Sequence, residues 1–395
     1  MSWLKDFIRG NRHLFLFSLT VVTLLRLIRV RLQTFPLPSG WSKFDFIPRR
    51  SKLNTIPQNY TQKATPNTNA LLNALQDDRV RIDNLLGNSL RSFPISFSWP
   101  GSLDSSLVEL WEKREAFSKV IPGEPYSFFD YPTYLRQYQN SKFAITIKKG
   151  GWDCFRHVEI LASGCVPIMP DVKQCPEWAM EIYPKAAMAE VLSHIVENRE
   201  ISQTFVHELY RFFEDYLTSE AMARFLLKRV GFSGGQVIFL DPYLNTAPEY
   251  LSVSTYVGLK QILGRDGVTA PFGADPIFKG WSGNHSLLHG LGFGYTNLLD
   301  TALMSPIESA RTGDLLSTEN LEKKNLVIIG SLSRNQELAN RVNQLEFQSS
   351  NVLYLWGDDR SPNRQEIKWL KQLRGFIAFR ELHGGQKTAK YLEQD

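Results

Sequence analysis

Short apolar segments alternate with amphipathic stretches over most of residues 70–379, and this alternation limits the possible folds more than any other feature. The apolar segments have the length and composition of buried strands. The stretches between them repeat their apolar residues with helical spacing. Strands that alternate with helices form parallel sheets with helical crossovers. The sequence therefore predicts an α/β fold.

The pattern predicts the individual elements. Strands are expected at 93–99, 143–147, 165–169, 237–240, 326–329, 352–355 and 376–379. Helices are expected at 70–86, 106–118, 131–138, 155–163, 186–198, 202–228, 251–263, 337–345 and 365–373.

The length of 395 residues exceeds what one hydrophobic core usually supports. A glycine-rich break at residues 231–235 is the best boundary. We therefore expect two Rossmann-like units, at 70–230 and 231–395, which show no sequence repeat.

The N-terminal region carries the chain's basic charge. Residues 1–52 hold a net charge of +8, whereas the whole chain has +5 and the remainder −3. An apolar run at 14–25 is followed by arginines at 26, 29 and 31. A signal anchor, an in-plane helix on anionic lipid and a buried core helix all fit this pattern. We expect a membrane-associated helix at 1–32, and a linker at 33–69 that is rich in proline and polar residues.

Charge and composition exclude several classes. The content of 43% hydrophobic and 22% charged residues is that of a globular protein. The slightly acidic body argues against a nucleic-acid partner. Only three cysteines occur, which argues against a disulfide framework. The sequence argues against a dehydrogenase, because no Gly-x-Gly-x-x-Gly motif follows a strand with an acidic residue about 20 positions further on.

The segment from Lys148 to Met169 has the features of an anion site. Gly150 and Gly151 allow a close backbone approach, and the helix that follows offers free N–H groups. Lys148, Lys149 and Arg156 add positive charge for phosphate oxygens. His157 lies beside them, and Glu159 lies one helical turn beyond Arg156, where it could accept hydrogen bonds from a ribose. We expect these seven residues to bind a nucleotide diphosphate.

The same segment resembles the donor-binding half of exostosin-like GT-B glycosyltransferases. The similarity covers about residues 90–185 and rests on Ser141-Lys142-Phe143, on Arg156 and Glu159, and on Gly164-Cys165-x-Pro167. It implies that Arg156 contacts the diphosphate of a nucleotide sugar and that Glu159 contacts the ribose or the sugar. It also implies sugar transfer to a glycan or another hydroxyl acceptor, with no metal and no cofactor besides the nucleotide-sugar substrate.

The second unit resembles the acceptor-side half of such enzymes more faintly. In GT-B enzymes the acceptor domain comes first, whereas here it follows the donor domain. Either the chain is permuted, or the two units are not one catalytic pair. Asp241, His285 and His289 are the candidates for a catalytic base. A membrane-tethered protein that binds a nucleotide or glycan without catalysis is the alternative.

Overall fold

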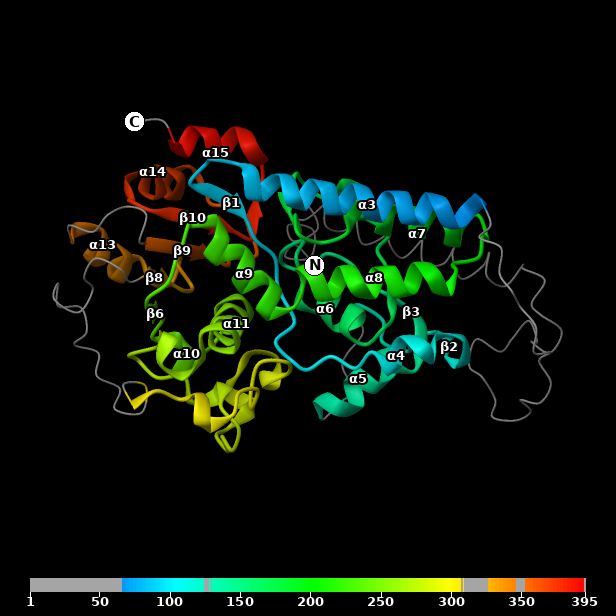
Figure 1. The fold of residues 1–395 in the computed structure, drawn as a ribbon, viewed down its shortest axis with the longest axis horizontal. Helices are drawn as coiled ribbons and strands as arrows, with labels where there is room; N and C mark the ends of the chain where they lie inside the picture. The colour runs from blue at the N-terminus through cyan, green and yellow to red at the C-terminus, as the bar shows by residue number, and fades with distance from the viewer. Residues whose placement is uncertain are drawn as a thin grey trace, which may run out of the picture.

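The computed structural model describes residues 66–123, 128, 130–306, 308, 326–345 and 352–393. The expected helix at 1–32 and most of the expected linker at 33–69 lie outside these residues. Within them, no helix combines the length and the apolar composition needed to span a membrane. The fold is α/β, as predicted, with two parallel sheets placed side by side (Figure 1).

The larger sheet has six parallel strands. In spatial order they are β1 (Ser92–Pro94), β10 (Phe376–Phe379), β9 (Val352–Trp356), β8 (Leu326–Ile329), β6 (Val237–Leu240) and β7 (Val268–Thr269). The four predicted strands of the second unit are all confirmed. Chain order reverses at β6, because β7 lies on one side of it and β8 on the other.

Helices cover both faces of this sheet. Val237 and Phe239 of β6 face a core shared with α9 (Ser219–Arg229) and α11 (Tyr250–Gly267). Ile238 and Leu240 face the opposite side. That side is covered by α13 (Gln336–Gln344), α14 (Arg364–Gln372) and α15 (Gly385–Glu393). The alternation of side chains along each strand supplies both cores, which explains why the strands are apolar throughout.

The smaller sheet contains β2 (Glu115–Phe117), β3 (Ser141–Ile145) and β4 (Val166–Ile168), all parallel. Helix α5 (Tyr131–Gln139) precedes β3, and α6 (Phe155–Ala162) connects β3 to β4. Ala144 and Cys165 pack with Ile160 and the tyrosines of α5. Val166 and Ile168 face the main core, which also contains α7 (Lys185–Val196).

The expected division at residue 231 is corrected at one strand. The segment 93–99 was assigned to the first unit, but β1 pairs with β10 in the larger sheet, with Phe93 opposite Ala378. The chain therefore enters the larger sheet first, crosses to the smaller one and returns at β6. Sequence periodicity cannot reveal this, because pairing between distant strands is not encoded in local spacing.

Two expected helices also differ. At 106–118 the chain forms α4 (Ser106–Glu109), a 3₁₀ turn at Trp111–Lys113 and β2, because Glu115 and Phe117 pair with β3. At 202–228 there are two helices, α8 (Gln203–Tyr216) and α9. Thr218 caps α9, its hydroxyl accepting the N–H of Ala221 at 3.2 Å. The neighbouring residues Leu217 and Ser219 bond the backbone of Trp99, which fixes the break.

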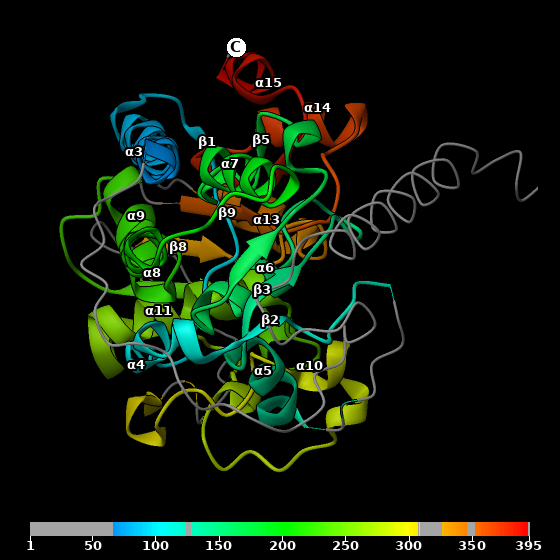
Figure 2. The same cartoon turned by 90° about the vertical axis from the view of Figure 1, so that its right-hand side faces the viewer.

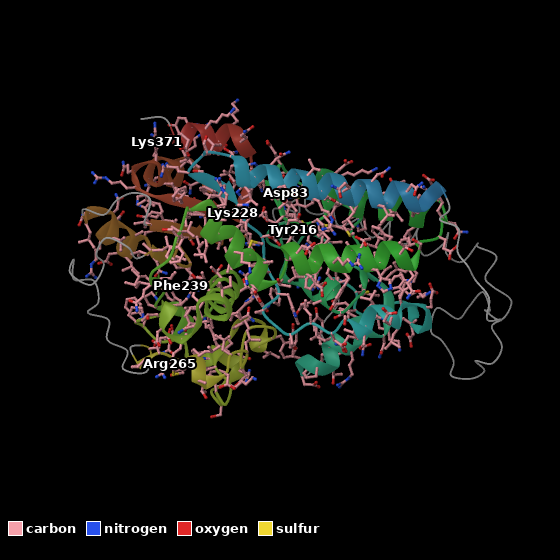
Figure 3. All side chains as sticks on the ribbon, in the orientation of Figure 1. Asp83, Tyr216, Lys228, Phe239, Arg265 and Lys371 are labelled. Carbon is pink, nitrogen blue, oxygen red and sulfur yellow. The ribbon has the colours of Figure 1, made fainter. Side chains whose placement is uncertain are left out.

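Helix α3 (Pro66–Gly87) lies along α7 and α8 (Figures 1 and 2). Figure 3 labels Asp83 of α3 and Tyr216 of α8, where these two helices face each other. The Tyr216 hydroxyl donates to Asp83 at 3.3 Å. Deeper in the contact, the buried Asp78 accepts the N–H groups of Ala186 and Ala187 at 3.2 and 2.9 Å. Asp78 thus caps α7 from a separate helix.

Replacing Asp78 by alanine should lower the free energy of unfolding by about 2 kcal/mol, because it uncaps α7 and removes one of the two carboxylates, Asp78 and Glu181, that pair with Arg81. Chemical denaturation measures this change. Asp77→Ala removes the same charge from the exposed side of α3 and serves as the control. Equal stability of the two variants would contradict the capping role.

Candidate functional site

The carboxyl ends of the two sheets meet at a glycine turn. This turn, residues 148–151, follows β3, whereas Asp359 follows β9 and Glu381 follows β10. A β-carbon on Gly150 would overlap the Asp359 carboxylate. One on Gly151 would lie 2.8 Å from Glu381 Oε1. The two glycines are therefore required by a close approach between the sheets.

Arg380 and Glu381 hold the turn in place. The N–H of Asp153 donates to Glu381 Oε1 at 2.9 Å, and the N–H of Trp152 bonds the same carboxylate. Arg380 donates to the carbonyls of Asp153 and Gly357 and forms an ion pair with Asp359. Both Arg380 and Glu381 are fully buried. Burial raises the pKa of Glu381 to about 6, although these donors oppose the rise.

A short antiparallel pair joins the sheets beside the turn. β11 (Glu381–Leu382), which follows the larger sheet, pairs with β5 (Trp178–Ala179), which follows the smaller one. Glu381 is opposite Ala179. Glu381 therefore contacts segments that follow the smaller sheet's strands in two ways. Its backbone pairs with β5, and its carboxylate bonds the backbone after the glycine turn.

Helix α6 carries the predicted nucleotide-binding residues on a buried surface. Arg156 and Glu159 are about 6% and 5% exposed. The hydroxyl of Tyr134 donates to Glu159 Oε2 at 3.0 Å, and the Tyr131 hydroxyl lies near the same carboxylate. Burial raises the pKa of Glu159 to about 7, while these hydroxyls, Arg156 and Lys149 oppose the rise. A carboxyl group with this pKa exchanges its proton near neutral pH.

The two lysines of the turn differ in environment. The Lys148 ammonium lies 5.4 Å from the centre of the Trp152 ring, and its charge acts on Asp171, Glu381 and His383. Lys149 is exposed, and its charge acts on Glu159. The turn thus provides positive charge next to two buried carboxyl groups.

His157 supports the turn from below. Its Nε2 lies 2.9 Å from the carbonyl oxygen of Trp152, and its Nδ1 lies 2.9 Å from the Thr146 hydroxyl. A carbonyl only accepts, so Nε2 carries the proton and Nδ1 accepts from Thr146. Burial lowers the pKa of His157 to about 4. This neutral, fully engaged ring positions the turn, and its geometry does not support the expected direct contact with a ligand.

Asp241 lies at the carboxyl end of β6, where strand order reverses. Ser331 and Asn335 donate to its two oxygens at 2.7 and 3.0 Å. Such reversals are the usual ligand sites of open parallel sheets. Asp241 itself is buried and accepts from three donors, including the N–H of Tyr243. These bonds give it an organising role between β6 and β8.

The other two predicted bases lie on an exposed segment. His285 Nδ1 is 3.1 Å from the carbonyl oxygen of Leu291, and the ring packs edge-on against Trp281. His289 packs edge-on against Tyr250, which stacks on Phe155 at the start of α6 with 4.3 Å between ring centroids. His289 is therefore near α6, whereas Asp241 is buried against Ser331 and Asn335, which follow β8.

The sequence interpretation did not single out His383, which the structure places beside Glu381 and Lys148. The signal was available, because charged residues directly after a buried parallel strand lie at its ligand-binding end. Among the described residues, no group of three or more His, Cys, Asp and Glu is arranged to hold a metal ion. Cys154 and Cys165 are buried free thiols, and Cys175 is a partly buried one.

Comparisons with known proteins give no family for this chain. No protein-family model, curated protein or solved structure matches it.

The buried neutral His157 predicts acid sensitivity. Its pKa is about 4 in the folded protein and about 6.5 in an unfolded chain, so only the unfolded chain takes up a proton between pH 6.5 and 4. The free energy of unfolding must therefore fall as pH falls. Between pH 7 and 5, the wild type should lose about 2 kcal/mol more than His157→Gln.

Urea denaturation of both proteins at the two pH values measures this difference. The buried carboxyl groups Asp153 and Glu159 titrate in both proteins, so their contributions cancel. His207→Gln, on α8, controls for the loss of a partly exposed histidine. Equal losses in wild type and His157→Gln would show that His157 is not held neutral.

Proposed function

We propose that this chain is a glycosyltransferase that transfers a sugar from a nucleotide-sugar donor to a hydroxyl acceptor, with the donor bound where the carboxyl ends of the two sheets meet. The observation that carries the proposal is this meeting of two parallel sheets at a basic glycine turn. Clefts outside the carboxyl ends of parallel strands are the usual nucleotide sites of α/β proteins.

We call the place where the carboxyl ends of the two sheets meet at the glycine turn the junction. The charges at the junction fit a diphosphate. Lys148, Lys149 and Arg156 come from the turn and from the first turn of α6. A helix N-terminus adds the positive end of its dipole. These groups would stabilise the negative charge that develops on the departing nucleoside diphosphate, and exclusion of water would strengthen the effect. Glu159 would accept a hydrogen bond from a ribose or sugar hydroxyl.

The two-unit arrangement also fits the GT-B-like interpretation. The smaller sheet with α6 would hold the donor, and the larger sheet would present the acceptor. Because β1 belongs to the larger sheet, that sheet contains strands from both sides of the donor segment in sequence. In GT-B enzymes the acceptor domain precedes the donor domain. The opposite order in this chain would still allow the donor-binding surface to face the acceptor-binding surface.

One observation favours the non-catalytic alternative. Arg156 and Glu159 are almost fully buried, and the Asp359 carboxylate occupies the space next to Gly150. A donor would have to displace Asp359 or enter between the sheets as they separate. A protein that kept the fold but lost turnover would bind a nucleotide without releasing a sugar.

Calorimetric titration of the purified full chain with a panel of nucleotide sugars and free nucleoside diphosphates tests the proposal. We expect saturable binding of one nucleotide class, weakened at least tenfold by Arg156→Ala and by Glu159→Ala, because each removes a contact to the donor. Lys149→Ala should also weaken binding, and this exposed residue can be changed with little risk to folding.

Matched controls are Arg136→Ala on the exposed side of α5 and Lys228→Ala on the exposed side of α9, which remove the same charges from other helices. Circular dichroism checks that each variant is folded. The donor site is wrong if the folded wild type binds no member of the panel, or if the controls weaken binding as much as the site variants. Binding without sugar release would establish the non-catalytic alternative.

A further inference from the structure

His383 and Glu381 form a histidine–carboxylate pair at the edge of the junction. His383 Nε2 lies 3.3 Å from Glu381 Oε2. The imidazole is partly open, with 45% of its side chain exposed, whereas the Glu381 side chain is completely buried. The backbone N–H of His383 donates to the Ser361 hydroxyl at 3.1 Å, which fixes the segment that carries the ring.

The carboxylate determines which nitrogen of His383 carries the proton. Burial raises the pKa of Glu381 to about 6, so the carboxylate is mostly ionised at neutral pH and accepts from Nε2–H. The other nitrogen, Nδ1, is then left with a lone pair. Nδ1 has no hydrogen-bond partner in the part of the chain that the structure describes. A fixed tautomer with a free lone pair is what a general base requires.

The pair is also next to the glycine turn. The Glu381 carboxylate that contacts His383 also accepts from the N–H groups of Asp153 and Trp152 at the end of the turn. The charged groups that face the imidazole among the described residues are Glu381 and Lys148. Lys148 is one of the cations assigned to the donor diphosphate. His383 would therefore lie close to the donor site.

We propose that His383 is the catalytic base that deprotonates the acceptor hydroxyl, and that Glu381 is its positioning residue. This inference rests on the proposed glycosyltransferase function. It replaces Asp241, whose carboxylate accepts three hydrogen bonds within the protein. It also ranks His383 above His285 and His289, because neither of these rings pairs with a carboxylate within the described part of the chain.

The transfer step follows from this geometry. The acceptor oxygen attacks the anomeric carbon of the donor sugar, and its proton moves to Nδ1 of His383. The bond between the anomeric carbon and the β-phosphate oxygen breaks, and the nucleoside diphosphate leaves with the electron pair. Glu381 stabilises the resulting imidazolium, which returns its proton to solvent. Attack opposite the leaving group inverts the anomeric configuration.

Enzyme kinetics tests the assignment on the full chain. The donor that binds in the panel is incubated with aryl and methyl glycosides, with water as the background acceptor, and nucleoside diphosphate release is followed. We expect His383→Ala to lower kcat at least 100-fold and to leave donor affinity within twofold of wild type. Added imidazole should restore part of the rate, because it replaces the missing base.

Glu381→Gln has a different signature, because it keeps a hydrogen-bond acceptor but removes the charge. Loss of the anion lowers the pKa of His383, so the acid limb of the kcat profile should move to lower pH while kcat falls. His207→Ala, on α8, is the matched histidine control and should keep kcat within about threefold of wild type.

NMR of the imidazole nitrogens gives a test that needs no donor. We expect His383 to be the Nε2–H tautomer at neutral pH in wild type and a mixture of tautomers in Glu381→Gln. An Nδ1–H tautomer in wild type would overturn the inference. So would donor turnover that survives His383→Ala, which would leave the proposed function intact. If no nucleotide sugar binds to the wild type, the proposed function fails and the assigned reaction fails with it.

Discussion

The contact of Arg380 and Glu381 with the glycine turn is the interaction on which the arrangement of the two sheets depends. Both side chains are charged and fully buried, a costly state unless each is paired and hydrogen-bonded. Their partners are Asp359 and the backbone that immediately follows the turn. Because these partners come from both units, the charges are satisfied only when the sheets meet. The glycines at 150 and 151 make that approach sterically possible.

This constraint places the proposed donor site and part of the stability in the same residues. The turn contacts the larger sheet through Asp359 and Glu381, and Lys148 and Lys149 add positive charge beside these carboxylates. His157 maintains the turn from within the smaller unit, using both ring nitrogens. Any ligand that enters the junction must therefore compete with carboxylates already present. We expect donor binding to be coupled to a small separation of the sheets for this reason.

Local structure was predictable from the sequence, because short apolar runs and helical spacing record burial directly. The strands at 237–240, 326–329 and 376–379 were placed correctly. The position of β1 beside β10 was not, since nothing in residues 92–94 encodes a partner almost three hundred residues away. The break between α8 and α9 could have been found, because Thr218 is a strong capping residue. At the site, spacing located the turn and α6, but it could not show that Glu381 and His383 would lie beside them.

The central claim is that a nucleotide diphosphate binds at the junction of the two sheets. Hydrogen–deuterium exchange of the full chain, with and without saturating nucleoside diphosphate, tests it most directly. We expect slower exchange at residues 148–156 and at 380–383, on both sides of the junction, and little change at the exposed segment 281–291. Protection confined to that exposed segment, with unchanged exchange at the turn, would contradict it.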